Sequence, residues 1–158
     1  ASSDNEFLTV RQRFTGKGTG LLFIANYYNE EHSGKIKYTH PVTGEVIPVP
    51  YCCEEALWPP LYGVLSPLCL EIRDGIKILH STSDILKISD DVKRVEITVH
   101  GDRDLPGEMV FEGEQVRKIE KVMVDRAEIT AVREKGRVAF SYPHRDREEF
   151  TLQIMMSL

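Results

Sequence analysis

Acidic side chains gather in the stretch HGDRDLPGEMVFEG, residues 100–113, between two apolar runs. Asp102, Asp104 and Glu108 resemble part of a calcium loop, but counting from Asp102 places Pro106 at the fifth position, where an EF-hand needs an oxygen ligand. Asp104 and Glu108 could instead form a glycosidase pair, whose carboxyl groups lie roughly 5–9.5 Å apart across a cleft. The flanking sequence supplies no pocket wall for such a pair. A plain connection between two strands is therefore the favoured interpretation.

The glycines and the proline of this stretch fit a strand connection. Gly101 and Gly107 are expected to supply unusual backbone angles, and Pro106 is expected to stiffen the turn between them. On this interpretation the stretch carries no catalytic residue and no metal ligand.

Other residues capable of chemistry are scattered. The histidines are His32, His40, His80, His100 and His144. They show no zinc-binding spacing with each other or with the cysteines. Cys52 or Cys53 could act as a thiol nucleophile with a distant histidine, but the sequence offers no third group to orient it. The glycine-rich GKGTG at residues 16–20 precedes a strand-like run, so we expect a hairpin rather than a phosphate-binding loop.

Three aromatic residues lie in an apolar segment outside the clearest strand patterns. Tyr51, Trp58 and Tyr62 could form a platform that stacks on the apolar faces of sugars. Trp58 could equally plug one end of the fold or face a neighbouring domain. Because Pro59 and Pro60 stiffen this segment, we expect Trp58 and Tyr62 at an interdomain surface rather than in the core.

Composition limits the classes of partner. The chain has 158 residues, a net charge of −5 and no basic run, so we expect no nucleic-acid partner. No apolar run approaches the roughly 20 residues that span a membrane. The three cysteines include an adjacent pair, so we expect free thiols rather than a disulfide framework. Free thiols favour a cytoplasmic location, and no cofactor is indicated.

Alternation of apolar and polar residues dominates the chain and predicts an antiparallel all-β fold. One-sided apolar patterns occur at residues 35–40, 95–99, 138–142 and 150–156. Asp74-Gly75 predicts a hairpin turn. The prolines of PVTGEVIPVP predict an edge strand there. Regular short strands with glycine and proline turns are typical of a β-sandwich, and the sequence offers no domain boundary.

Two segments leave secondary structure open. Residues 114–134 fit a helical spacing, but their β-branched residues favour two strands broken near Asp125-Arg126. Residues 54–58 are expected to form one short helical turn that ends before Pro59-Pro60.

Three stretches together resemble a known family. They are GTGLLFIANYYNEEHSGKIKY, LCLEIRDGIKILHSTSDIL and VEITVHGDRDLPGEMVFEG, within residues 6–113. They are similar to the accessory β-domain that follows the catalytic barrel in family thirty-five glycoside hydrolases, the β-galactosidases. In the second stretch the family pattern falls on Asp74, Ile78, Leu79, Ser81, Thr82, Ile85 and Leu86. In the third it falls on Gly101, Gly107 and Glu108.

The resemblance implies a single β-sandwich accessory domain over residues 1–158, cut from a larger glycoside hydrolase. Its partner would be the catalytic domain of the same parent chain, and it would have no chemistry of its own. The barrel and its catalytic glutamates are absent from this sequence, so no catalytic residue can be carried over. A free-standing carbohydrate-binding module is the alternative, and a small enzyme or metal protein is a third class.

Overall fold

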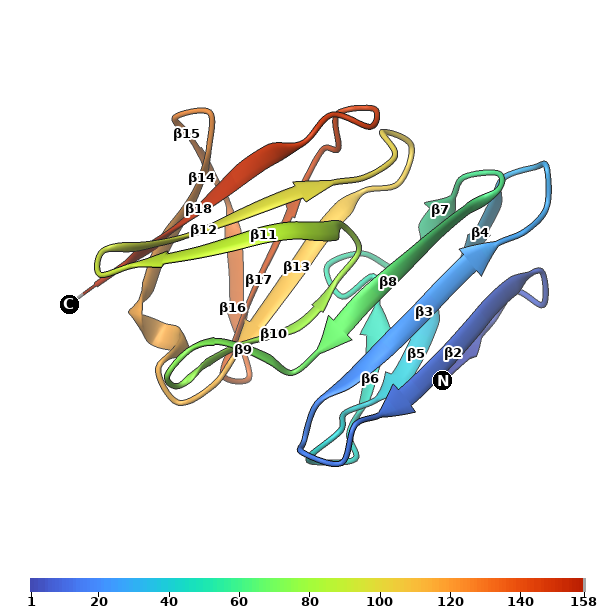
Figure 1. Cartoon of the computed structure of the whole chain (residues 1–158). Coiled ribbons are helices and arrows are strands. Elements are labelled where there is room, and N and C mark those ends of the chain that lie inside the picture. Colours follow the sequence, from blue (N-terminus) through green and yellow to red (C-terminus); the bar gives the residue numbers. More distant parts are fainter. Residues whose placement is uncertain (158) are drawn as a thin grey trace.

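The computed structural model describes residues 1–157, and it is an all-β protein (Figure 1). Strands make up 61% of the chain and helix 2%, and every strand pairing is antiparallel. This confirms the predicted class. The four sheets with three or more strands are arranged like the blades of a small propeller rather than as one clear sandwich.

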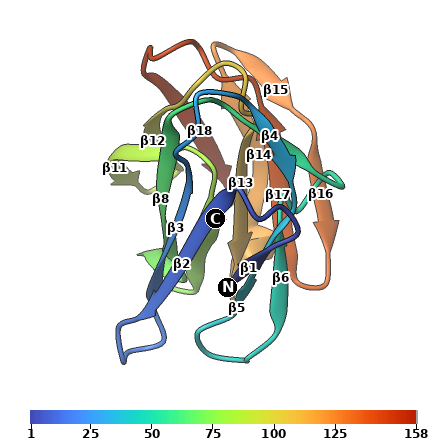
Figure 2. The same cartoon turned by 90° about the vertical axis from the view of Figure 1, so that its right-hand side faces the viewer.

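The first half of the chain forms three small sheets. The N-terminal sheet consists, in spatial order, of β1 (Ser2–Ser3), β5 (Ile36–Thr39) and β6 (Val46–Val49). The hairpin sheet consists of β2 (Leu8–Phe14), β3 (Gly20–Asn26) and β8 (Tyr62–Leu68). A two-stranded sheet pairs β4 (His32–Gly34) with β7 (Ala56–Trp58). Figure 2 shows the hairpin sheet as one layer and β5 and β6 as another.

The second half forms two larger sheets. The shared sheet consists of β16 (Ala131–Glu134), β17 (Arg137–Tyr142), β13 (Gly107–Glu112), β10 (Ile76–Ser81) and β9 (Leu70–Arg73). The C-terminal sheet consists of β11 (Asp84–Asp91), β12 (Arg94–His100), β18 (Phe150–Met156), β14 (Ile119–Val124) and β15 (Ala127–Ile129). A 3-10 turn, η1 (Val116–Lys118), precedes β14. Among residues 1–157, no helix is long and apolar enough to cross a membrane.

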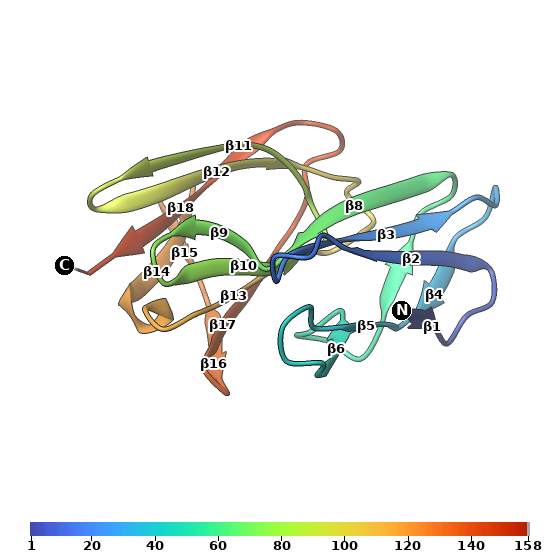
Figure 3. The same cartoon turned by 60° about the horizontal axis from the view of Figure 1, so that its bottom comes forward.

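The shared sheet is buried on both of its faces. Along β13, Met109 and Phe111 point into a core shared with the C-terminal sheet, whereas Val110 points into a core shared with the N-terminal and hairpin sheets. Side chains alternate between the two faces of a strand, so each side of β13 serves a different core. Figure 3 shows the two resulting groups of strands side by side, with the termini at opposite ends.

This arrangement corrects the expectation of a single β-sandwich. A sandwich strand buries one face and exposes the other, but five of the six residues of β13 are buried. The chain passes from the hairpin sheet into the shared sheet at Cys69, whose positive φ of 56° turns the backbone between β8 and β9.

Most of the turn and strand predictions are confirmed. Residues 15–19 connect β2 to β3 in a hairpin, and Asp74-Gly75 connects β9 to β10, with Gly75 at φ 78°. The proline-containing β6 is an edge strand, as its sequence predicted. The one-sided patterns also hold, since Val95, Ile97 and Val99 are all buried.

After the short turn η1, residues 119–134 form strands β14, β15 and β16 with short breaks between them. β14 and β15 pair directly across Asp125-Arg126, and both turn residues have positive φ, 49° and 68°. Positive φ at both central residues is characteristic of the tight turns that favour hairpins. The prediction of strands broken at this dipeptide is confirmed, and the segment adds a third strand, β16.

The expected helical turn at residues 54–58 is wrong. Ala56–Trp58 is strand β7, which pairs with β4 so that Trp58 lies opposite His32. The extended backbone places Ala56 and Trp58 on the same, buried side. Burial of that tryptophan therefore outweighs the local preference for a helical turn.

Candidate functional site

The first part of the acidic stretch, residues 101–106, is a strand connection, as favoured from its sequence. β12 ends at His100 and β13 begins at Gly107, so the stretch links the C-terminal sheet to the shared sheet. Within it, the Asp102 carboxylate accepts the backbone N–H of Asp104 at 2.9 Å, and the Asp102 carbonyl accepts the N–H of Leu105 at 3.0 Å. These local bonds fix the turn.

The two glycines of the connection are needed for a different reason from the expected one. Neither Gly101 nor Gly107 has a positive φ, so the prediction of unusual backbone angles is wrong. Instead, a Cβ at Gly101 would lie 2.5 Å from the ring of His144, and one at Gly107 would lie 2.3 Å from the ring of Tyr142. Both glycines are required because buried rings pack directly on the backbone.

Glu108 does not join the aspartates of the loop. Asp104 is exposed, whereas Glu108 is buried in β13 and accepts the N–H groups of Tyr51 at 2.6 Å and Cys52 at 2.8 Å. His80 Nε2 donates to the same carboxylate at 2.8 Å. Burial raises the pKa of Glu108, but the bonds from His80 and the two backbone amides outweigh burial and hold the pKa below its usual value.

His80 extends this bonding to the N-terminal sheet. Its Nδ1 accepts the hydroxyl proton of Tyr38 on β5 at 2.7 Å. Burial, with smaller effects from Cys69 and Glu112, raises the pKa of Tyr38 well above its usual value, so the hydroxyl stays a donor. We call Tyr38, His80 and Glu108 the closed cluster, because all three are at most 2% exposed. It joins the N-terminal and shared sheets from within the core.

A second cluster lies four residues along the same face of β13. Glu112 Oε1 lies 2.6 Å from His40 Nε2 and 3.6 Å from Cys69 Sγ, and the sulfur and the nitrogen are 3.6 Å apart. His40 directly follows β5, and Cys69 lies between β8 and β9. We call His40, Cys69 and Glu112 the open cluster, because His40 and Glu112 line a surface hollow of ≈ 730 Å³.

Hydrogen bonds determine where the proton of His40 lies. The backbone N–H groups of Val42 and Thr43 donate to His40 Nδ1 at 3.0 and 3.2 Å, so Nδ1 is an acceptor. The neutral ring therefore carries its proton on Nε2 and donates it to Glu112.

Cys69 is a protonated thiol that donates to Glu112. Burial, followed by the charge of Glu112, raises the pKa of Cys69 to about 12. A thiol at that pKa is a poor nucleophile at neutral pH. The sequence allowed Cys52 or Cys53 as a nucleophile without favouring either, whereas the structure places Cys69 beside His40.

Arg137, on β17, lies beside the open cluster. Its guanidinium lies 3.4 Å from Glu112 Oε2 and 2.5 Å from Glu45 Oε2. Burial lowers the pKa of Arg137, but bonds to Glu45 and Tyr51 and the negative charges of Glu45 and Glu112 together outweigh burial and raise the pKa above its usual value. The bond from Arg137, with a smaller opposing effect of burial, lowers the pKa of Glu45. The open cluster therefore places a carboxylate, an imidazole and a thiol beside a fixed positive charge.

A serine and a histidine meet in a third place. Ser83 Oγ lies 2.6 Å from both His144 Nε2 and the Tyr142 hydroxyl, and His144 Nδ1 donates to the Leu105 carbonyl at 2.6 Å. Burial lowers the pKa of His144, so the ring stays neutral. This pair has the geometry of a serine nucleophile and its base, but Ser83 is fully buried. Its bonds hold the rings that pack on Gly101 and Gly107.

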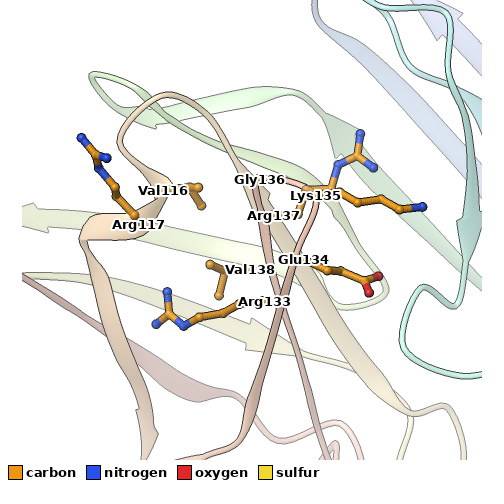
Figure 4. Close-up of a pocket in the computed structure, with 8 residues that line it drawn as sticks. All are labelled: Val116, Arg117, Arg133, Glu134, Lys135, Gly136, Arg137 and Val138. Carbon is orange, nitrogen blue, oxygen red and sulfur yellow. The ribbon is translucent and has the colours of Figure 1, made fainter.

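A smaller hollow of ≈ 250 Å³ is lined by residues of η1, β16, β17 and the turn between those two strands, and four of these residues are basic (Figure 4). Figure 4 shows that Arg117 and Lys135 point away from each other. Arg133 is already bonded to the carbonyls of Ile119 and Glu120, and Arg137 is bonded to carboxylates. These side chains do not converge on one point, so they form no anion site.

The aromatic residues singled out from the sequence share one core. Trp58 is fully buried and its Nε1 donates to the Gly34 carbonyl at 3.4 Å, so the expectation of an exposed Trp58 is wrong. Tyr51 and Tyr62 are partly buried against the same core. The Tyr62 hydroxyl accepts the Asp102 N–H at 3.3 Å. Trp58 cannot stack on a sugar or on another domain while the chain is folded.

The sequence contained a signal for both clusters. The alternation over residues 35–40 put Tyr38 and His40 on one face, and Glu108 and Glu112 are an even number of residues apart on β13. What it lacked was the pairing of segments far apart in the chain, because 42 residues separate Tyr38 from His80 and 72 separate His40 from Glu112.

Comparison with known proteins adds no relative: the sequence matches no family model and no curated protein at a significant level.

Proposed function

We propose that this chain is a non-catalytic accessory domain of a β-galactosidase-like glycoside hydrolase, which packs against the catalytic barrel of its parent protein. The proposal starts from the resemblance of residues 6–113 to that accessory domain. A fold or a family likeness alone does not fix a function, so the argument depends on how the surfaces and polar groups of the chain are used.

An apolar outer face on the hairpin sheet carries the proposal. Leu21 pairs with Pro67, and Phe23 pairs with Leu65, across β3 and β8. Their neighbours in the strands point into the core, so these four side chains lie on the opposite face, where Leu21 is 40% and Leu65 is 52% exposed. Contiguous apolar residues on the surface of a soluble domain mark an interaction site.

The polar residues around this face support a docking role. Arg13 and Arg11 pair with Leu21 and Phe23 on the β2 side, and both arginines are exposed. An apolar centre with a charged border is the usual composition of a protein interface. Within the fold, the closed cluster joins the N-terminal and shared sheets, which suits a rigid support.

Leu65→Asp tests the docking surface in the full-length enzyme produced from the natural coding sequence. We expect faster thermal loss of galactosidase activity in the intact enzyme and little change in the unfolding of the isolated chain, because an exposed substitution removes few internal contacts. Val92→Asp is the matched control, since Val92 is also an exposed apolar residue at 69% but lies between β11 and β12.

Equal inactivation rates for the two variants would contradict the proposal. A natural coding sequence that holds no (β/α)8 barrel beside this chain would contradict it as well.

A carbohydrate-binding module is the second candidate, and one aromatic group favours it. Phe7, Tyr28 and His32 pack together, with the rings of Phe7 and His32 stacked at 4.7 Å. Tyr28 is 48% exposed, and the adjacent Tyr27 is 63% exposed. Exposed rings can stack on sugars. Titration of the isolated chain with galactose and lactose would favour this function if Tyr27→Ala or Tyr28→Ala abolished binding.

A further inference from the structure

The open cluster has the donor atoms and the geometry of a metal site. We propose that His40 Nε2, Cys69 Sγ and Glu112 Oε1 bind one Zn²⁺ ion, with a fourth position open to solvent. All three donor atoms lie within 4.8 Å of one another. This proposal is independent of the accessory function, because it concerns different residues and needs no parent enzyme.

The two distances from the Cys69 sulfur to the other donor atoms match those expected around a tetrahedral zinc ion. Bond lengths of about 2.3 Å to sulfur and about 2.0–2.1 Å to nitrogen or oxygen place tetrahedral sulfur and nitrogen roughly 3.5 Å apart. The observed distances from Cys69 Sγ to His40 Nε2 and to Glu112 Oε1 are both 3.6 Å. The nitrogen–oxygen distance is 2.6 Å, so the ring and the carboxylate must separate by roughly 0.7 Å to admit the ion.

The chemistry of the donor set selects zinc among common divalent ions. A thiolate and an imidazole suit zinc, whereas calcium and magnesium prefer oxygen ligands alone. The Cys69 thiolate and the Glu112 carboxylate would balance the two charges of the ion. Arg137 is already paired with Glu45, so the buried groups around the bound ion would be close to neutral.

Three ligands from the protein leave the fourth position of a tetrahedral ion for water or a small ligand, as in catalytic rather than structural zinc sites. The hollow of ≈ 730 Å³ beside His40 and Glu112 provides the approach, and Lys77 and Thr43 also line it. The residues of the closed cluster, by contrast, are at most 2% exposed. A ligand with a nitrogen or sulfur donor, such as imidazole, is therefore expected to bind the metal from this hollow.

Metal binding has a consequence for the neighbouring turn. The proton on His40 Nε2 must move to Nδ1 when Nε2 binds the ion, and one further proton leaves Cys69 for solvent. Nδ1 would then carry a hydrogen that faces the N–H groups of Val42 and Thr43, which now donate to it. The turn at residues 41–44 must release these bonds, and it can do so because Val42 is 62% exposed.

Titration with Co²⁺, followed by displacement with Zn²⁺, tests the site in the whole chain. We expect one equivalent of Co²⁺ to give a thiolate charge-transfer band and the intense visible bands of tetrahedral cobalt, both removed by Zn²⁺. The doubly substituted variant C52S/C53S is the matched control and should keep the bands, because Cys53 is exposed and Cys52 lies beside the closed cluster. Cys69→Ser should lose the charge-transfer band.

Glu112→Gln keeps the shape of the glutamate side chain. It provides a second test of the site in case Cys69→Ser does not fold. It should bind Co²⁺ at least about 10-fold more weakly, the lower end of what changes beside a metal produce. Unchanged circular dichroism would show that each variant is folded. No charge-transfer band in the wild type, or a band that survives Cys69→Ser but is lost in C52S/C53S, would overturn the proposal and assign the binding to the surface pair.

Hydrogen exchange gives a second and more specific test. On addition of Zn²⁺, the amides of Val42 and Thr43 should exchange faster, while those of Tyr51 and Cys52 in the closed cluster should not change. A metal bound elsewhere would leave the first pair of amides unchanged. Slower exchange at Val42 and Thr43 would also contradict coordination through His40 Nε2.

Discussion

Glu108 and Glu112 lie on the same face of β13, four residues apart, and each accepts a hydrogen bond from a histidine nitrogen. The two sites differ in what the other nitrogen of the histidine meets. His80 Nδ1 accepts from the buried hydroxyl of Tyr38, whereas His40 Nδ1 accepts from backbone amides in an exposed turn. The side chain of Glu108 is 3% exposed and that of Glu112 is 16% exposed. One carboxylate–histidine pair is therefore sealed into the core, and the other faces a hollow.

The comparison shows that the same pair of residue types can serve two purposes on one strand. A fully buried carboxylate must have its hydrogen bonds satisfied by the protein, and the closed cluster does this with two amides and an imidazole. A carboxylate at the edge of the core keeps an approach from solvent, and with a thiol added it becomes a potential ligand site.

Trp58→Ala should give a loss of stability as large as that of any single substitution in the core that holds the closed cluster. Because its side chain is fully buried, Trp58→Ala should lower the free energy of unfolding by about 3–5 kcal/mol. Urea unfolding followed by circular dichroism measures the loss. A loss below about 1 kcal/mol, typical of a surface substitution, would place Trp58 outside the core.

Glu108→Ala should be as damaging as loss of the tryptophan. The substitution leaves the Tyr51 and Cys52 amides and His80 without their acceptor. Each buried donor left unsatisfied costs about 1–3 kcal/mol, and three are affected. The urea midpoint of this variant should therefore fall as far as that of Trp58→Ala. If Glu108→Ala cost no more than Glu112→Ala, the distinction between the two clusters would be wrong.

Glu112→Gln should have a smaller effect on the unfolding of the metal-free chain. The amide still accepts the hydrogen bond from His40, and the buried Arg137 keeps its pair with Glu45. We expect a loss of about 1–2 kcal/mol, near the value for hydrogen bonds that involve a charged group. Thermal unfolding alongside Glu108→Gln would check whether the open cluster is the more tolerant one.

The pH dependence of stability should separate two buried groups. Glu108 has a lowered pKa in the folded chain, so its contribution is present above the unfolded value of about 4.3 and is lost as the pH falls through the folded value. His144 also has a lowered pKa. Its contribution is present above about 6.5 and is lost as the pH falls from there through its folded value.

Urea midpoints measured from pH 7.5 down to pH 3 would resolve these two ranges. His144→Gln should flatten the profile just below pH 6.5, and Glu108→Gln should flatten it below about pH 4.3. If His144→Gln left the upper range unchanged, the neutral, buried state of that histidine would be wrong.

The sequence predicted the strands well because each depends on a local pattern. The alternation at residues 95–99 and 150–156, the turn at Asp74-Gly75 and the break at Asp125-Arg126 are all local features, and all are confirmed. The prediction of a helical turn at residues 54–58 was wrong because a distant strand, β4, pairs with this segment, in which Trp58 is buried. A single sandwich was expected because the sequence alone does not show that β13 meets one core on each face.

The candidate sites were less predictable than the strands, because each combines segments brought together only by sheet packing. Cys69 carried no signal of its own, and neither His40 nor Glu112 lies at metal-ligand spacing from it. The acidic stretch at residues 100–113 supplies one member of the closed cluster, Glu108, and one member of the open cluster, Glu112, and both lie in its strand β13.

The most direct test of the contrast between the clusters is a comparison of unfolding with and without Zn²⁺ for the wild type, Glu108→Ala and Glu112→Ala, all in the C52S/C53S background. Zn²⁺ should raise the thermal midpoints of the wild type and of Glu108→Ala by a similar amount, although Glu108→Ala starts from a lower midpoint. It should leave the midpoint of Glu112→Ala unchanged, because a ligand stabilises only a folded state that binds it. An equal rise in all three proteins, or a rise lost only in Glu108→Ala, would contradict a closed structural cluster beside an open ligand site.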